Sequence, residues 1–156
     1  RNNLQNMRAV IQRVSEASVQ IENQQVATIK RGLLILLGIE VEDTLEDVKW
    51  LSNKITQLRI FSDDEGKMNK SVIEADGSAI VVSQFTLHAK TKKGNRPSYL
   101  KAARSEQAFT LYEEFKKGLS GGIGKKVQSG EFGAEMQVSL VNDGPVTILI
   151  DTKNKE

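Results

Sequence analysis

The sequence contains no cysteine, a single histidine and only two prolines among its 156 residues. Without cysteine the chain can form no disulfide, can carry out no thiol chemistry and offers no thiolate to a metal. The lone His88 also excludes a zinc site built from several histidines of one chain. We therefore expect no metal and no cofactor. The lack of disulfides is compatible with a cytoplasmic location, which we predict.

Long hydrophobic runs are also lacking, since the longest covers only residues 33–39. A membrane-spanning helix needs about 20 apolar residues, so we expect no membrane partner. No basic segment followed by an apolar stretch opens the sequence, which predicts no secretory leader. We interpret the polar residues 1–6, before Met7, as a leftover of cloning, with native upstream sequence as the alternative. Residues 7–156 are then expected to form one domain.

Positive and negative side chains nearly balance, because 22 Lys and Arg face 20 Asp and Glu and the formal net charge is only +2. The distribution is more informative than the sum. The segment from His88 to Arg104 contains no acid and carries six cations, namely Lys90, Lys92, Lys93, Arg96, Lys101 and Arg104. Such a segment is able to contact nucleic-acid phosphates. A solvated basic loop without a partner is the ordinary alternative.

The order of apolar and polar residues predicts an α+β fold. Alternation or short apolar runs predict strands at 8–14, 17–21, 26–29, 33–37, 59–61, 79–87, 127–132, 136–141 and 146–151. Two segments with helical spacing begin at Asp43 or Thr44 and at Ser105, and glycines 121, 122 and 124 end the second. We predict a curled, mostly antiparallel sheet or barrel packed with two amphipathic helices.

Two glycine-containing segments resemble ligand loops only superficially. Residues 63–66 lack the alternating acids and the distal glutamate of a calcium loop, so a tight turn is expected there. Residues 121–126 lack the first glycine and the Ser or Thr of a phosphate-binding loop. Neither segment is therefore a candidate site.

Polar residues interrupt an apolar strand at Ser83-Gln84-Phe85-Thr86. Ser83 and Thr86 are possible nucleophiles, but no triad is available to activate them. The amide of Gln84 is suited to stabilising an oxyanion. His88 is a possible general base, although an exposed strand end is the commoner role for a lone histidine in this context. The alternative for the whole motif is a strand end whose side chains bond to nearby backbone.

A second irregular segment, Asn142-Asp143-Gly144-Pro145-Val146-Thr147, lies between two strong strand patterns. Glycine and proline together favour a turn, so an ordinary hairpin connection is the local interpretation. Only about 5% of bonds before proline are cis, so the pattern alone does not predict that form.

With these two motifs, the chain resembles the D-aminoacyl-tRNA deacylase family from Met7 to about Thr152. The resemblance includes the opening at residues 7–14, the Ser-Gln-Phe-Thr motif, the Asn-x-Gly-Pro-Val-Thr motif, the Gly130–Ala134 segment and Met136. Each motif is short, but together and in this order they are specific. The resemblance implies a homodimer with two active sites at the interface.

In that family the Gly-Pro peptide is cis and acts as a main-chain chiral filter in the partner's site. The resemblance thus implies that Gly144 and Pro145 exclude L-amino acids, accept D-amino acids and reject glycine weakly. Arg13 is similar to the residue that holds this loop, and Asn142 belongs to the same motif. The expected activity is hydrolysis of the ester of D-aminoacyl-tRNA, and of mischarged glycyl-tRNA.

The resemblance also implies that Ser83, Gln84, Phe85 and Thr86 line the pocket for the aminoacylated terminal adenosine. Phe132 and Met136 are expected to flank that pocket. Water is the expected nucleophile, helped by the substrate's ribose hydroxyl and by backbone amides near Gln84 and Phe85, with covalent attack by Thr86 as the rival. The basic segment is a possible clamp on the acceptor stem of the tRNA. The alternative function is a tRNA-binding module without chemistry.

Overall fold

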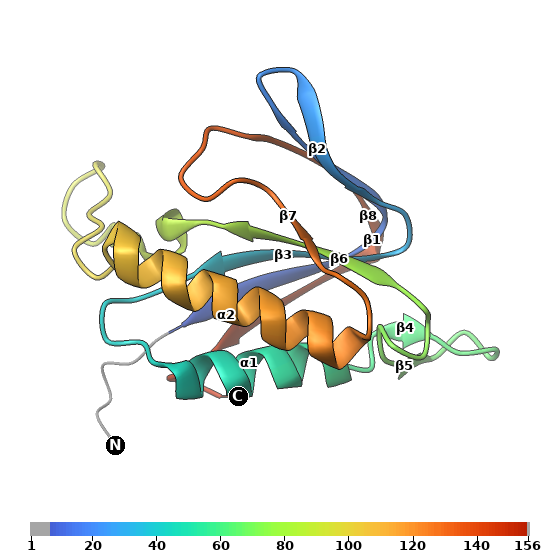
Figure 1. Ribbon diagram of the computed structural model, residues 1–156. Coiled ribbons are helices and arrows are strands. Elements are labelled where there is room, and N and C mark those ends of the chain that lie inside the picture. The colour runs from blue at the N-terminus through green and yellow to red at the C-terminus, as the bar shows by residue number, and fades with distance from the viewer. Residues whose placement is uncertain (1–6, 156) are drawn as a thin grey trace.

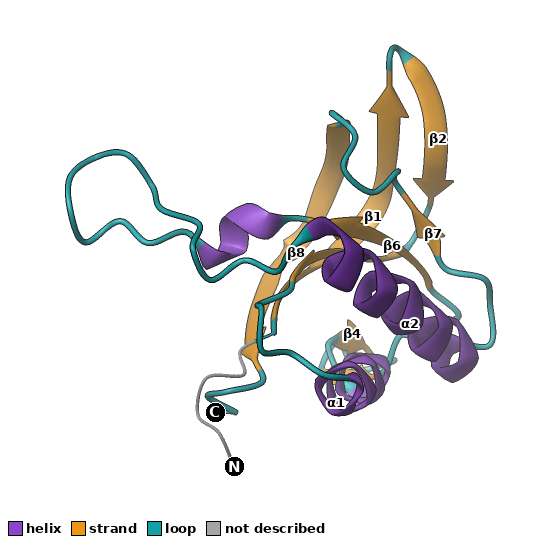
Figure 2. Cartoon of the chain, turned by 60° about the vertical axis from the view of Figure 1, so that its left-hand side comes forward, coloured by secondary structure: helices purple, strands orange, loops and turns teal. Residues whose placement is uncertain are grey.

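The computed structural model describes residues 7–155, which form one six-stranded mixed sheet with two long helices on one side (Figures 1 and 2). Strand order in the sheet is β2-β1-β3-β6-β7, and β8 pairs with β1. The interpretation of residues 1–6 as a leftover of cloning lies outside the described residues. The predicted α+β class, with a curled sheet and two helices, is confirmed.

Strand β1 (Arg8–Ile21) pairs with three other strands, antiparallel in each case: β2 (Gln24–Ile29), β3 (Gly32–Gly38) and β8 (Gln137–Asp151). The predicted strands 8–14 and 17–21 are thus one strand. The tight turn to β2 uses Glu22 and Asn23, both with positive φ.

The apolar run 33–37 forms the centre of the sheet, as its two-sided hydrophobicity predicts. Strand β3 pairs antiparallel with β1 and parallel with β6 (Ser78–Ser83), which in turn pairs parallel with the short β7 (Gln128–Ser129). Two pairings are therefore parallel and three antiparallel. The predicted strand 127–132 is shorter than expected, because the chain leaves the sheet after Ser129.

The two helices cover one face of the sheet. Helix α1 (Leu45–Gln57) begins after Thr44, whose N–H donates to the carboxylate of Asp47 at 3.0 Å, as a capping box requires. Helix α2 (Ser105–Ile123) begins at Ser105, where the helical spacing was predicted to start, and Arg104 occupies its N-cap position. It continues past Gly121 to Ile123, with Gly124 as its C-cap at a φ of 82°. Gly122 packs closely on α1, because an added Cβ there would lie 2.7 Å from Cγ2 of Thr56.

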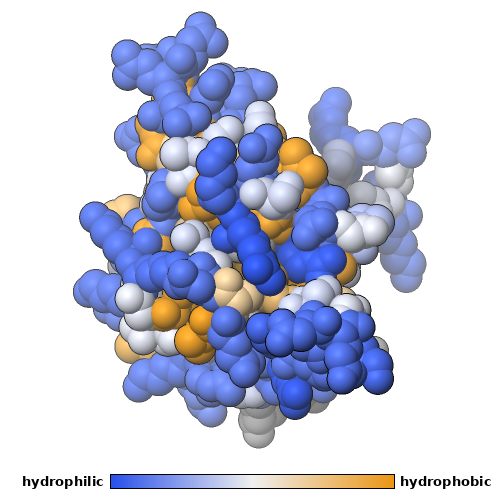
Figure 3. Space-filling model, turned by 90° about the vertical axis from the view of Figure 1, so that its right-hand side faces the viewer, coloured by the Kyte–Doolittle hydropathy of each residue, from blue (hydrophilic) through white to orange (hydrophobic). Residues whose placement is uncertain are grey.

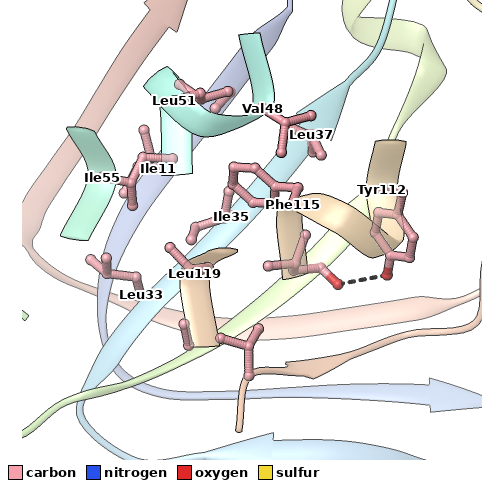
Figure 4. Close-up of a cluster of buried hydrophobic side chains, with 14 of the residues drawn as sticks. Ile11, Leu33, Ile35, Leu37, Val48, Leu51, Ile55, Tyr112, Phe115 and Leu119 are labelled. Atoms are coloured by element: carbon pink, nitrogen blue, oxygen red, sulfur yellow. Dashed lines mark hydrogen bonds between the residues drawn. The ribbon is translucent and has the colours of Figure 1, made fainter. Parts of the chain in front are cut away.

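The main core lies between these helices and the sheet (Figure 4). Apolar side chains from both helices meet those of β1 and β3, among them Ile11, Ile35, Leu51, Phe115 and Leu119. A smaller core on the other side of the sheet contains Val14, Val19, Leu34, Ile80 and Val82. The sheet is thus covered on both faces where its strands are most apolar.

Tyr112 is the one labelled core side chain in Figure 4 that makes a hydrogen bond. Its buried hydroxyl donates to the carbonyl of Val81 at 3.2 Å. Replacement of Tyr112 by phenylalanine keeps the ring but removes this buried hydrogen bond, which we expect to cost about 1 kcal/mol and to lower Tm by about 2–4 °C. Thermal unfolding measures the change. Tyr99→Phe, at a partly exposed ring, is the control and should leave Tm unchanged.

A small second sheet joins β4 (Phe61–Ser62) to β5 (Met68–Lys70). The predicted tight turn connects them: Asp63 Oδ1 accepts from the N–H groups of Glu65 and Lys67, and Gly66 has a φ of 82°. No helix within residues 7–155 is long and apolar enough to cross a bilayer. The face seen in Figure 3 is mostly hydrophilic, with separate hydrophobic patches between the polar side chains.

Candidate active site

The polar motif at residues 83–88 forms a turn at the end of β6. Strand β6 ends at Ser83, and residues Phe85–His88 form the 3₁₀ helix η1. The predicted strand 79–87 is therefore wrong beyond Ser83. The physical reason is that its partner β3 ends at Gly38, so the chain satisfies its backbone locally through bonds such as Ala89 N to Thr86 O at 3.1 Å. We call residues 83–88 the 83–88 turn.

The backbone N–H groups of the 83–88 turn differ in whether they already donate a hydrogen bond within the protein. The N–H of Gln84 donates to the carbonyl of Leu37 at 2.8 Å, so it is not free to bind an oxyanion as the sequence suggested. Phe85 and Thr86 begin a 3₁₀ helix, and the first N–H groups of a helix have no partner within it. The N–H groups of Phe85 and Thr86 thus have no partner within η1, whereas that of Gln84 is bound to Leu37.

Side chains of the turn point in different directions. Phe85 is 57% exposed and meets Tyr99 edge-to-face, with ring centroids 4.9 Å apart. The amide of Gln84 donates to the hydroxyl of Thr86 at 3.0 Å. An amide donor cannot remove the proton of that hydroxyl, so this contact does not activate Thr86 as a nucleophile.

A cavity of about 520 Å³ lies beside the turn, within the range typical of ligand sites. The predicted residues Ser83, Phe85, Phe132 and Met136 line it, together with Tyr99 and Arg104 from the basic segment. Phe132 is held by edge-to-face contact with Phe109 and by the ring of Tyr112. Among the described residues that line the cavity, Arg104 is the only one with a charged side chain. The cavity is thus mainly apolar and aromatic.

Residues Tyr99 and Arg104 were not singled out as individual pocket residues by the sequence. An aromatic residue inside an acid-free basic segment was the available signal, because aromatic rings and cations together are typical of surfaces that bind unpaired nucleotides. The basic loop, residues 90–104, projects from the body of the protein directly after η1 (Figures 1 and 2). Reciprocal backbone hydrogen bonds between Lys90 and Ser98 close it.

His88 does not lie at an exposed strand end, contrary to the commoner role considered above. Its side chain is 2% exposed and its Nδ1 lies 4.0 Å from Oε2 of the equally buried Glu40. Burial is the first cause that lowers the pKa of His88 and also the first that raises the pKa of Glu40. Such a buried ring cannot reach substrate as a general base.

The second motif, residues 142–147, is not a hairpin connection. Both flanking strand patterns belong to the single strand β8, which pairs with β1 on either side of the motif. The register between the strands breaks near Val14, and the extra residues form a bulge on an edge strand. The hairpin interpretation is therefore wrong, because one long partner strand holds both halves.

The bulge is fixed by two side chains. Arg13 donates to the carbonyl of Asp143 at 3.0 Å and to that of Ile60 at 2.8 Å. Asn142 accepts from the N–H of Val146 at 3.0 Å and donates to the hydroxyl of Thr147 at 3.1 Å. Within this bulge the Gly144–Pro145 peptide bond is cis, and both Gly144 and Pro145 are exposed.

Within one chain the two motifs are far apart. Ser83 pairs with Leu37 at one end of β3, whereas Arg13 pairs with Leu33 near the other end. Four residues of strand separate these positions, about 13 Å along the sheet. The structure thus brings together Ser83, Phe85, Phe132 and Met136 around one cavity, and places Arg13, Asn142, Gly144 and Pro145 around a separate exposed bulge.

These features define a single-domain protein with a mixed sheet, an aromatic cavity at a strand end and a fixed glycine–proline bulge. A family model described as D-Tyr-tRNA(Tyr) deacylase matches residues 10–151. The chain therefore belongs to the D-Tyr-tRNA(Tyr) deacylase family.

Curated relatives agree with this assignment. The chain is 61% identical over 150 residues to D-aminoacyl-tRNA deacylase of Bacteroides fragilis, covering 96% of this chain and 100% of that protein. It is 59% identical to the enzyme of the same name from Flavobacterium johnsoniae, with the same coverage. The protein is thus an enzyme, a hydrolase with D-aminoacyl-tRNA deacylase activity. The alternative of a binding module without chemistry is not supported.

Solved structures share the fold. A structure titled c-Myc DNA Unwinding Element Binding Protein matches with a TM-score of 0.86 and 42% identity, over 92% of this chain and 97% of that one. A structure titled as a probable eukaryotic D-amino acid tRNA deacylase matches with a TM-score of 0.81 over 94% of this chain and 99% of that one. At 18% identity the second shows the fold alone.

Proposed function

We propose that two copies of this chain form each active site, in which the cavity of one copy binds the substrate and the 142–147 bulge of the other selects its chirality. The separation of the two motifs in a single chain carries this proposal. Both are exposed, and about 13 Å of strand lies between their positions on β3. A rigid bulge that cannot reach its own cavity is able to act on that of a partner.

The edge of the sheet offers a surface for such a homodimer. Among residues 7–155, β8 pairs only with β1, so its other edge is open along the strand. Exposed apolar side chains accompany this edge at Val138, Val141 and Leu149. An open edge with apolar side chains favours association with another copy, which covers both the backbone groups and the apolar surface.

The cavity is suited to the aminoacylated terminal adenosine of tRNA. Phe85, Tyr99 and Phe132 supply aromatic faces, which bind unpaired bases by stacking. Ser83, Gln84 and Thr86 supply polar groups near the ester, and Met136 fills the remaining apolar side. A protein that acts on this substrate works in the cytoplasm, where tRNAs are aminoacylated and used.

Water is the nucleophile in this proposal. The hydroxyl of Thr86 accepts a hydrogen bond from Gln84, and none of the hydrogen bonds found among residues 7–155 joins it to a base. The free ribose hydroxyl of the substrate helps to orient the water. The N–H groups of Phe85 and Thr86 stabilise the oxyanion that forms as water attacks the ester. The products are free tRNA and the amino acid, and the chemistry requires no metal or cofactor.

The bulge selects the D-aminoacyl ester by steric exclusion of the L-aminoacyl ester. Carbonyl groups of Gly144 and Pro145 occupy the space that the side chain of an L-amino acid would need, whereas a D side chain points away from them. Glycine has no side chain to exclude, so mischarged glycyl-tRNA is expected to be hydrolysed as well. Arg13 and Asn142 keep the carbonyls in place.

The decisive test uses matched D-tyrosyl-tRNA and L-tyrosyl-tRNA, with a chelator in a parallel reaction. Loss of only the D ester, unaffected by the chelator, supports a stereospecific, metal-independent deacylase. Hydrolysis of both esters at similar rates contradicts the chiral filter. Binding of tRNA without hydrolysis of either ester contradicts the enzymatic function.

The basic loop is proposed to hold the acceptor stem. Lys92 and Lys93 are exposed on it, and no acid lies between residues 88 and 104. Replacing both lysines by glutamine should raise KM for tRNA with kcat unchanged, and should reduce the slope of log affinity against log salt by about 2. Lys117→Gln/Lys126→Gln removes the same charge from exposed positions elsewhere and is the control. Equal effects of the two double variants would contradict the clamp.

A further inference from the structure

We propose that His88 and Glu40 form a buried pair that positions the 83–88 turn against the opposite wall of the cavity during deacylation. The proposal rests on the assignment of Phe85 and Thr86 to the active site. Neither His88 nor Glu40 is a catalytic residue in this scheme, because neither lines the cavity. They are positioning residues that act through the backbone on which they lie.

The first observation is that two ionisable side chains are buried next to each other and that one ring nitrogen of His88 has no hydrogen-bond partner among the described residues. The side chains of His88 and Glu40 are 2% and 3% exposed, and Nδ1 and Oε2 are 4.0 Å apart. The Nε2 atom of His88 is buried without a hydrogen-bond partner among the described residues. A buried polar atom without a partner costs stability, so an apolar side chain at this position would stabilise the fold more.

The second observation is where the two residues lie. His88 ends η1, which carries Phe85 and Thr86. Glu40 belongs to the segment that holds residues 101–103: it forms a β-bridge with Ala102, and the flanking Val41 N and Ala103 N donate to Lys101 O and Ile39 O. The pair therefore connects η1, which carries Phe85, with the segment bridged to Ala102, close to Tyr99. These two segments form opposite walls of the cavity, where Phe85 and Tyr99 meet.

The backbone of Glu40 is held in place, so its side chain offers His88 a contact at a defined position. Its backbone N–H donates to the carboxylate of Asp43 at 2.6 Å. Gly38, two residues earlier, lies so close to η1 that an added Cβ would be 3.1 Å from Cδ2 of His88. Because His88 ends η1 and packs directly on Gly38, a shift of its ring is expected to move the turn.

Charged groups from four other segments surround the pair. Arg8 of β1 donates to the carbonyl of Leu87 at 2.8 Å and pairs with Asp151 of β8. Lys101 of the basic loop acts on both members of the pair, and Lys153 after β8 acts on Glu40. Burial is the largest cause that lowers the pKa of His88; a backbone hydrogen bond with Gly38 raises it, Arg8 and Lys101 lower it, and Asp151 raises it.

The sign of the pH dependence follows from that lowered pKa. A folded-state pKa below the ordinary value means that the unfolded chain binds the proton more readily. The packing of His88 therefore contributes fully above its unfolded pKa, about 6.5, and is lost as pH falls below it. Protonation of the ring beside Arg8 and Lys101 should loosen the 83–88 turn in acid.

The test combines two variants with the rate of D-tyrosyl-tRNA hydrolysis. At pH 7.5 we expect His88→Gln to lower kcat about 10-fold with KM little changed, because the cavity and the basic loop are intact. The ratio of wild-type to variant kcat should shrink toward pH 5.5, since only the wild-type ring titrates. Glu40→Gln should also lower kcat, and the double variant should lose little more than either single one. Equal, pH-independent kcat values or fully multiplicative losses would overturn the proposal.

His88 is the only histidine in the chain, so its ring can be followed by NMR without assignment variants. We expect the wild-type ring to titrate below the ordinary value and at a changed pH in Glu40→Gln, even if His88→Gln does not fold. A ring that titrates like an exposed histidine, unaffected by Glu40→Gln, would overturn the pairing. Failure of the wild-type enzyme to hydrolyse the D ester would instead overturn the proposed function and leave this titration intact.

Discussion

Replacing Gly144 by alanine should lower the ratio of D-ester to L-ester hydrolysis by about 100-fold, the size of effect that a small misplacement at an active site produces. The φ of Gly144 is 131°, a conformation that L residues rarely adopt. An added Cβ would lie 2.9 Å from Cγ2 of Val146 and 3.0 Å from Nη2 of Arg13. The bulge must therefore shift, and the shift moves the carbonyls proposed to exclude L-amino acids.

Single-turnover rates with both tyrosyl-tRNAs measure this ratio. Gly66→Ala is the matched control, because Gly66 also has a positive φ, of 82°, but an added Cβ there meets nothing within 4 Å. The control should lose some stability and keep its selectivity. A Gly144→Ala protein that retains the wild-type ratio would show that the bulge does not set chirality.

Replacing Gly38 by alanine should lower kcat for the D ester by about 100-fold while the fold persists. Gly38 ends β3 beneath the 83–88 turn, and an added Cβ would lie 2.8 Å from Cβ of Leu87 and 3.2 Å from the carbonyl of Gln84. The turn cannot keep its position over such a side chain. The N–H groups of Phe85 and Thr86 would then move away from the ester.

Rates at saturating tRNA, with thermal unfolding of the same samples, separate this effect from loss of fold. Gly121→Ala is the control, since an added Cβ at that helical position meets nothing within 4 Å and alanine favours helix. It should keep full activity and unfold at an equal or higher temperature. A folded Gly38→Ala enzyme with wild-type kcat would contradict the role of the turn.

The two variants together also test the shared active site. In a mixed dimer, the intact cavity of a Gly144→Ala subunit receives the intact bulge of a Gly38→Ala subunit. An excess of Gly38→Ala protein should therefore restore selectivity to Gly144→Ala protein. If selectivity is not restored after subunit exchange, each bulge acts on its own chain.

Most of the local structure was predictable because it depends on neighbouring residues. The helical spacing of Val48, Leu51 and Ile55 and the two-sided apolar run 33–37 place those segments in the core, whatever else surrounds them. The motifs at 83–86 and 142–147 likewise identified the residues later found around one cavity and one bulge.

The errors fall where a distant partner decides the outcome. Residues 84–87 continue a strand pattern, yet the strand ends because β3 ends at Gly38. Residues 142–147 contain turn residues, yet no turn forms because β1 is long enough to pair on both sides of them. His88 stands next to a basic loop but is buried, because Glu40 and the segment held to Ala102 close over it.

The sequence by itself thus determined the class of fold and the family, and it supplied the residues that we propose for the active site. Only the tertiary structure decided how those residues are divided between a cavity and a separate bulge, that the N–H of Gln84 is bound to Leu37, and that the single histidine is buried. Periodicity and motifs report the local preference of a segment. Pairing partners, strand lengths and burial depend on contacts between residues far apart in the chain, which no local pattern records.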